Sequence, residues 1–240
     1  MKILGIGDSF MAGDGSVGTL GLKNQDWYLS MLAKKLNASY VSFGFSGTGP
    51  WNTFFKFLDY ENKEELDVVI FAWSEATRIY HPNDEIPLNT GTVLHMEYPK
   101  TLKPIYEAAN QYFKYLFDYR KVGYEAKGLY HMVDDLALQY PNIKFIHMYC
   151  FSHQVDTSTK HMDNYKAKTT DNLQYLYDFK NGVNIRPALM YLSVQDQMVE
   201  DLSKETRSCH LSPYMHQLVL QTLYKAITES KNGDIIHATR

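Results

Sequence analysis

The sequence predicts an α/β fold in which helices cover both faces of a mostly parallel sheet. Short apolar runs that end in glycine, asparagine or polar residues alternate with longer segments whose apolar residues recur at helical spacing. This alternation is typical of parallel sheets, because two parallel neighbours need a long crossover connection, usually a helix. A chain of 240 residues fits one such domain, and no linker-like stretch divides it. We therefore expect residues 1–240 to form a single domain.

Five segments are predicted as strands, because each is a short apolar run bounded by turn residues. They are Lys2–Ile6, Tyr40–Phe43, Asp67–Trp73, Lys144–Tyr149 and Ala188–Leu192.

Helices are predicted where apolar residues recur every three or four positions. Residues 102–139 are long enough for two helices, which we expect to be separated near Gly123. Residues 81–99 and 151–171 lack such a pattern and are predicted as loop insertions, which often shape the site in folds of this kind. The other predicted helices are Asp26–Leu36, Trp51–Tyr60 and Pro213–Ser230.

The composition argues against several classes of protein. A net charge of −3 and a pI near 6.3 provide no global positive field for nucleic acid or an anionic membrane. No apolar run reaches the roughly 18 residues of a membrane span, and no signal peptide is evident, so a cytoplasmic protein is expected. Cys150 and Cys209 form no CxxC motif, which favours reduced thiols over a single disulfide. The nine histidines show no HExxH-like spacing, so no metal site is expected.

Tyrosine is unusually frequent, with 19 residues in the chain. Many lie within residues 106–124 and 165–179. Because a tyrosine has an apolar ring and a polar tip, these residues suit helix faces half-buried against the domain. The alternative is a sugar- or ring-binding wall, an interpretation that requires a cleft.

Ser9 directly follows the first predicted strand, in the stretch GIGDSF. A dinucleotide-binding loop would need a third glycine where Phe10 stands and an acidic residue at the end of the second strand, and neither is present. A helix cap is always available to such a serine. A third interpretation, a nucleophile, requires a base and donors that hold an oxyanion.

Suitable partners for a nucleophile follow other predicted elements. Residues 44–47 (GFSG) come after the second strand, where a glycine allows a backbone N–H to approach a ligand closely. Ser74 comes after the third strand, and His210 lies just before the helix that begins at Pro213. Because the loops after parallel strands converge at the carboxyl edge of the sheet, we expect these groups to meet near Ser9.

At these residues the chain resembles the SGNH, or GDSL-type, esterase and lipase superfamily. The resemblance runs from the GDS of residues 7–9 to the histidine before the last helix, and so covers the whole chain. It implies a flavodoxin-like three-layer α/β/α sandwich and a hydrolase of carboxylic esters that needs no cofactor. It also implies that Ser9 is the nucleophile and His210 the general base. The implied oxyanion donors are the backbone N–H groups of Ser9 and Gly47, together with the Ser74 side chain.

The chain departs from the family pattern at two places. The third block of the family is usually Gly-x-Asn-Asp, whereas residues 72–75 are AWSE, so a hydroxyl stands where an amide would donate. One weakened oxyanion donor costs roughly 3 kcal/mol of transition-state stabilisation. The family's acid lies three residues before the histidine, where this chain has Arg207. Glu205 is the candidate that would orient His210, with Asp201 or a backbone carbonyl as alternatives.

Several neighbouring residues have two interpretations. We expect Asp8 to brace the turn that carries Ser9 rather than to react. Trp73 belongs either to the core or to the wall of a pocket. Glu75 and Arg78 form either a structural ion pair or a contact with a polar substrate. His216, within the last helix, is expected to pack or to face solvent.

The expected substrate is a small-molecule or carbohydrate ester, because the polar, tyrosine-rich loops favour a short acyl group such as acetyl on a sugar. One alternative is a catalytically impaired domain that binds a glycan or a protein partner. Its motivation is the altered third block and the missing acid. A second alternative is an acyltransferase that uses the same residues.

Overall fold

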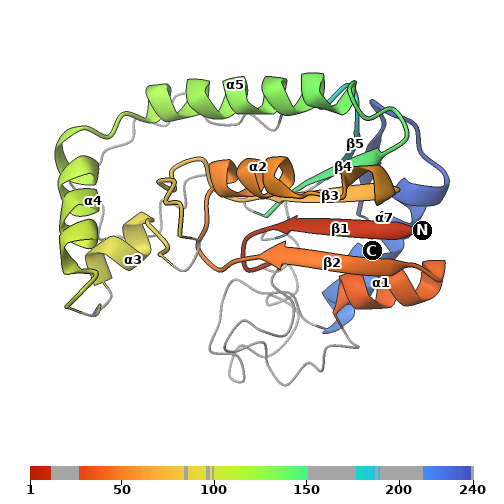
Figure 1. The fold of residues 1–240 in the computed structure, drawn as a ribbon, viewed down its shortest axis with the longest axis horizontal. Coiled ribbons are helices and arrows are strands. Elements are labelled where there is room, and N and C mark those ends of the chain that lie inside the picture. Colours follow the sequence, from red (N-terminus) through yellow and green to blue (C-terminus); the bar gives the residue numbers. More distant parts are fainter. Residues whose placement is uncertain are drawn as a thin grey trace.

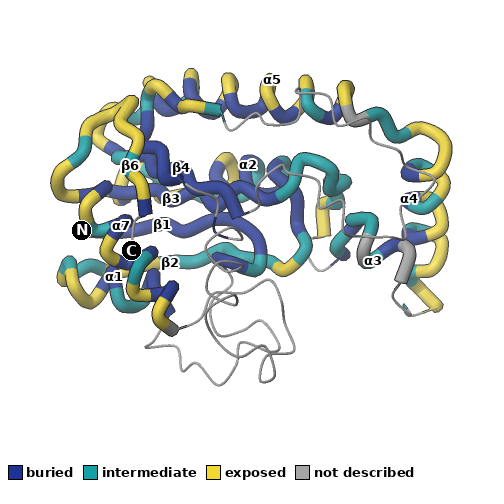
Figure 2. Tube along the Cα trace, turned by 180° about the vertical axis from the view of Figure 1, so that it is seen from behind, coloured by how far each residue is buried: buried dark blue, intermediate teal, exposed yellow. Residues whose placement is uncertain are grey.

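The computed structural model describes residues 1–11, 27–83, 86–95, 98, 100–150, 177–186, 189 and 213–238. Six parallel strands form one sheet in the order β2-β1-β3-β4-β5-β6. Strands β1 to β5 are labelled in Figure 1, and β6 is labelled in Figure 2. The order of the first five is the flavodoxin-like one, and β6 extends the sheet at one edge. The strands are β1 (Lys2–Gly7), β2 (Ser39–Gly44), β3 (Val68–Trp73), β4 (Lys144–Tyr149), β5 (Val183–Arg186) and β6 (Ile235–His237).

Helices cover both faces of the sheet, which confirms the expected α/β/α sandwich. One apolar cluster joins α1 and α7 to one face, and a second joins α2 and α5 to the other. The helices are α1 (Tyr28–Leu36), α2 (Pro50–Asp59), α3 (Thr90–His95), α4 (Lys103–Tyr115), α5 (Tyr119–Ala137) and α7 (Pro213–Thr228), with a short 3₁₀ helix at Lys63–Glu65. In the described part of the chain, no helix is long and apolar enough to cross a bilayer.

Strand β3 shows why the central strands read as continuous apolar runs. Figure 2 shows β3 buried along its length. Because the side chains of a strand alternate between the two faces of the sheet, both faces are buried here. The face covered by α1 and α7 receives Val68, Ile70 and Ala72. The face covered by α2 and α5 receives Val69, Phe71 and Trp73.

Trp73 lies in the core and not at the wall of a pocket. Its ring is fully buried and stacks on Phe71 and Phe179 at centroid distances of 4.8 and 5.9 Å. Its indole N–H donates to Nδ1 of the buried His147 at 3.2 Å. Burial lowers the pKa of His147 well below 6.5, because the charged imidazole would lose its hydration. Of the two interpretations of Trp73, the structure therefore supports the core one.

The fifth strand lies earlier in the chain than predicted, and the sheet has six strands rather than five. Leu189 is helical, so the predicted strand Ala188–Leu192 is wrong at that residue, and the rest of that segment lies outside the described residues. The observed β5 was missed because Asn184 makes it look polar. The Asn184 amide is buried and bonds both the N–H and the carbonyl of Phe179, each at 2.9 Å.

The long helical region also divides at a different place from the one predicted. It breaks between Tyr115 and Tyr119, and Gly123 lies inside α5. The break is set by Asp118, whose carboxylate accepts the Arg120 N–H at 2.8 Å and caps α5. The predicted loop 81–99 contains α3, which packs against α4 in a separate apolar cluster. The predicted loop 151–171 lies outside the described residues.

Candidate active site

The candidate site lies where the strand order reverses. The chain passes from β1 to β2 on one side and then to β3 on the other side of β1, and such a switch point leaves a crevice at the carboxyl ends of the strands. The register places Gly7 of β1 level with Gly44 of β2 and Ala72 of β3. The segments that follow these strands therefore meet at one edge, as expected from the sequence.

Ser9 lies on a tight turn that the surrounding protein braces from several directions. The Asp8 carboxylate accepts the Phe10 N–H at 3.1 Å, and the Asp8 carbonyl accepts the Met11 N–H at 2.9 Å. The Phe10 carbonyl accepts the hydroxyl of the buried Tyr28, the first residue of α1, at 2.7 Å. Asp8 is fully buried, whereas Ser9 is half-buried. The turn thus holds Ser9 half-buried at the carboxyl edge of the sheet, and Asp8 braces the turn through its carboxylate and its carbonyl.

The segment after β2 forms a second turn that requires glycine. The Thr48 N–H donates to the Phe45 carbonyl at 3.3 Å, and Gly47 has a φ of 83°, as at the third position of a type II turn. A Cβ at Gly47 would lie 2.5 Å from Cβ of Pro87. Among the described residues, no backbone carbonyl accepts the N–H of Ser9 or of Gly47. An oxyanion donor must not already donate to a backbone carbonyl, and both N–H groups meet this requirement among the described residues.

Ser74 holds this second turn in place. Its side chain is buried, and its hydroxyl donates to the Thr48 carbonyl at 2.6 Å. A hydroxyl carries one proton, so a Ser74 that donates to Thr48 has none left for an oxyanion. The arrangement differs from the one implied by the family resemblance, in which the Ser74 hydroxyl would donate directly to the oxyanion.

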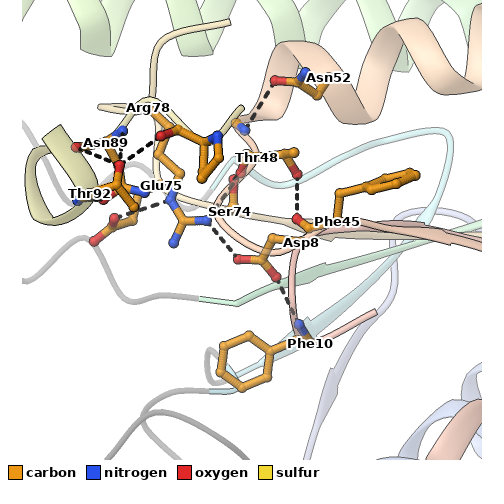
Figure 3. A network of polar contacts seen from close by, with 12 residues as sticks. Asp8, Phe10, Phe45, Thr48, Asn52, Ser74, Glu75, Arg78, Asn89 and Thr92 are labelled. Carbon is orange, nitrogen blue, oxygen red and sulfur yellow. Dashed lines mark hydrogen bonds and ion pairs between the residues drawn. The ribbon is translucent and has the colours of Figure 1, made fainter. Parts of the chain in front are cut away.

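Arg78 joins the segments that follow β1, β2 and β3 (Figure 3). Its Nη1 lies 3.2 Å from Oδ2 of Asp8 and 3.1 Å from the carbonyl oxygen of Thr48. Its Nε lies 3.4 Å from Oε2 of Glu75, which gives the ion pair considered from the sequence. The pair between Arg78 and Asp8 was not expected. It is the more buried of the two, with side-chain exposures of 8% and 0%, whereas Glu75 is 44% exposed.

Burial raises the pKa of the Asp8 carboxyl above its usual 3.8, and the charge of Arg78 opposes that rise. Hydrogen bonds from the Cys150 thiol and the Phe10 N–H oppose it as well. Burial also raises the pKa of the Cys150 thiol well above 9.0, so this free cysteine stays protonated beside Asp8. Sequence reasoning missed Cys150 at the site, although its place directly after β4 was a usable signal. No group of three metal-binding side chains occurs among the residues that the structure describes.

The predicted base lies outside the described residues, as do Glu205, Asp201 and Arg207. The helix that follows His210 is described, and its first turns contact the Ser9 side of the site. His216 is buried, and its Nδ1 accepts the Tyr28 N–H at 3.4 Å while the two rings stack at 5.6 Å. His216 therefore packs, which was one of its two expected roles.

No family model and no curated protein matches the chain. The similar solved structures include a catalytic mutant of an acetylxylan esterase from Geobacillus stearothermophilus, with 14% identity, 95% of this chain and 94% of that chain covered, and a TM-score of 0.49. An α/β hydrolase enzyme from the metagenome of Lake Arreo has 14% identity, 94% of each chain covered and a TM-score of 0.49. A psychrotrophic esterase from Pseudoalteromonas sp. has 12% identity, 95% and 97% covered and a TM-score of 0.44. Similarities of this level assign no role to any residue of this chain.

Proposed function

We propose that this protein hydrolyses carboxylic esters with Ser9 as nucleophile, as a divergent member of the SGNH, or GDSL-type, superfamily. One observation carries the proposal: the braced turn of Ser9 meets the glycine turn of Gly47 at the switch point of the sheet. Arg78 connects the two turns through Asp8 and the Thr48 carbonyl. A serine whose role was only to cap a helix would need no such second turn.

In the proposed reaction, Ser9 Oγ attacks the acyl carbon while His210 accepts the hydroxyl proton. The backbone N–H groups of Ser9 and Gly47 hold the oxyanion of the tetrahedral intermediate. When the intermediate collapses, the C–O bond to the alcohol breaks and His210 protonates the leaving oxygen. Water then attacks the acyl-enzyme, gives its proton to His210, and the acid leaves as Ser9 regains its proton. No step uses a cofactor.

The position of α7 supports the role of His210. Tyr28 contacts both His216 in α7 and the Phe10 carbonyl in the Ser9 turn. His210 precedes Pro213, the first residue of α7, by three residues, and an extended chain of that length reaches about 10 Å. We propose Glu205 as the group that orients the imidazole, with a backbone carbonyl as the alternative.

Ser74 contributes indirectly in this proposal, by holding the Gly47 turn through the Thr48 carbonyl. The proposed acyl group is short, such as acetyl. The support for this is Glu75 at the carboxyl edge, whose side chain is 44% exposed, because an apolar chain placed against it would strip water from its carboxylate.

Gly47→Ala should lower kcat by roughly 10²- to 10³-fold, because the new Cβ and the positive φ would displace an oxyanion donor. Gly123→Ala is the matched control. A Cβ at Gly123, inside α5, would meet nothing within 4 Å, and alanine should stabilise the helix by about 1 kcal/mol. The measurements are steady-state kinetics on a short-chain acetate and urea unfolding. Wild-type kcat in a folded Gly47→Ala protein would exclude Gly47 as a donor.

The nucleophile itself is tested by exposing the protein to a fluorophosphonate and mapping the adduct by mass spectrometry. We expect a single adduct on Ser9, which His210→Ala abolishes because the hydroxyl then has no base. An unlabelled but folded wild-type protein would instead favour the non-catalytic binding domain. If labelling succeeds, comparing acyl transfer to a sugar with transfer to water separates an acyltransferase from a hydrolase.

A further inference from the structure

A cavity of about 360 Å³ lies on the side of the site covered by α2 and α5. Its walls are the first turn of α2, residues 76–80 and the first half of α5, with one residue from α4. The volume is near the lower end of the roughly 300–1,000 Å³ typical of small-molecule sites. Of the residues singled out in the sequence, Arg78 lines it. The cavity supplies the cleft that a ring-binding interpretation of the tyrosines requires.

Aromatic rings wall this cavity, and other rings hold them in place. Trp51 stacks on Phe55 at 5.8 Å between centroids, and Tyr80 packs on the same Phe55 at 5.0 Å. Tyr112, from the tyrosine-rich stretch, packs edge-on against Phe117 at 6.2 Å. Rings already fixed by packing lose little conformational entropy when a ligand binds. The walls are therefore preorganised for a flat or ring-shaped ligand.

The rim of the cavity carries one positively and one negatively charged side chain, and both can form hydrogen bonds. Lys121 Nζ and Glu125 Oε1 form an ion pair at 3.5 Å on α5, and both side chains are about half exposed. A long alkyl chain in the cavity would desolvate these charges without giving them partners. A neutral ring with hydroxyl groups fits both features, because its C–H face can lie on the aromatic walls while its hydroxyls pair with the rim.

Arg78 links the cavity to the proposed nucleophile. It lines the cavity, and its Nη1 also bonds the Asp8 carboxylate beside Ser9. Gly49, just after the Gly47 turn, packs against the same residue, since a Cβ at Gly49 would sit 2.9 Å from the Arg78 carbonyl oxygen. Pro50, the next residue, already belongs to the cavity wall. The cavity is therefore linked to the Ser9 turn and to the Gly47 turn through Arg78, which bonds the Asp8 carboxylate and the Thr48 carbonyl.

We propose that this cavity binds the alcohol part of the ester, and that this alcohol is a neutral ring bearing several hydroxyl groups, about the size of one sugar residue. The assignment to an ester rests on the proposed function, whereas binding of the ring does not require Ser9 to react. Among the tyrosines of residues 106–124 whose side chains the structure describes, Tyr112 is the one that lines the cavity. Tyr106 is buried in the core, and Tyr115 and Tyr124 are 67% and 77% exposed.

The kinetic test compares methyl 6-O-acetyl-β-glucoside with ethyl acetate, which has no ring. In Tyr80→Ala and Tyr112→Ala, we expect the ratio of kcat/KM for the glucoside ester to that for ethyl acetate to fall roughly three- to tenfold for each ring removed. Tyr124→Ala, on α5 but outside the cavity, is the control and should keep the wild-type ratio. Equal losses of kcat/KM on both esters would overturn the proposal. A loss of kcat/KM on phenyl acetate that is larger than the loss on the glucoside ester would also overturn it, because the phenyl ring has no hydroxyls.

A binding test separates this inference from the proposed reaction. Methyl β-glucoside is titrated into wild type and Ser9→Ala while tryptophan fluorescence is recorded. Trp51 is partly exposed in the cavity, whereas Trp27 and Trp73 are buried. We expect a saturable change in both proteins and a weaker affinity in Tyr80→Ala. Binding without any ester hydrolysis would remove the proposed function and keep the ring site. The absence of a saturable change in folded wild type would overturn the ring site.

Discussion

Replacing Ser9 with alanine is expected to abolish ester hydrolysis, with kcat falling by about 10⁴-fold or more. The acyl-enzyme cannot form without the hydroxyl, and the remaining oxyanion donors support only weak attack by water. Ser9 is half-buried, so the loss of one oxygen should leave the fold intact. The measurement is the initial rate on a short-chain acetate, with circular dichroism to verify folding.

Ser39→Ala is the control for this experiment. Ser39 is exposed at the start of β2, far from the carboxyl edge, so its hydroxyl should not matter for hydrolysis. If Ser9→Ala retained wild-type activity on every ester that the wild type cleaves, another residue would have to be the nucleophile.

Arg78→Met should lower the free energy of unfolding by about 3–5 kcal/mol, because it leaves a buried carboxylate at Asp8 without its ionic partner. Because the Ser9 turn and the Gly47 turn both lose a contact, kcat should fall as well. Asp8→Asn in the same chain removes the unpaired charge and still accepts the Phe10 N–H, so the double variant should regain part of the stability. Urea unfolding of the four proteins of this cycle measures the coupling.

The loss of stability in Arg78→Met should also depend on pH. Burial holds the pKa of Asp8 above 3.8, and removing Arg78 removes a charge that opposes this rise. When the pKa of a carboxyl is higher in the folded than in the unfolded protein, the free energy of unfolding falls as the pH rises from the unfolded pKa, here 3.8, to the folded pKa. The difference between wild type and Arg78→Met should therefore shrink as the pH is lowered towards 3.8.

Lys103→Met provides the surface control for the ion pair. Lys103 and Glu107 lie 3.6 Å apart on α4 with side chains 62% and 61% exposed, so water already screens their attraction. Breaking such a pair changes stability by at most about 1 kcal/mol. If Arg78→Met lowered the free energy of unfolding by no more than Lys103→Met does, Arg78 would not be needed to stabilise the buried Asp8.

Features that depend on residues close together in the chain could be predicted from the sequence alone. The central strands could be located because both of their faces are buried, which makes β3 a continuous apolar run. The alternation of strands and helices then implied the parallel sheet, and the parallel sheet implied that the loops after β1, β2 and β3 would meet. Gly47 was recognisable because residues 44–47 resemble the second block of the family, and its positive φ explains why a glycine stands there. Ser9 stood out for its place directly after the first strand.

The pairing of groups that are distant in the sequence could be read only from the folded structure. Arg78 and Asp8 are separated by 70 residues, and no local pattern connects them. The hydroxyl of Ser74 donates to a carbonyl in another loop, and the Cys150 thiol joins Asp8 from the end of β4. Strand β5 escaped prediction for the same reason, since Asn184 is tolerated in the core only because Phe179 satisfies its amide. The periodicity of apolar residues indicates which side of a helix or strand is buried. The partner of a buried polar group depends instead on how separate elements pack together. The candidate site is built from such partners, so its contacts could not be predicted from periodicity.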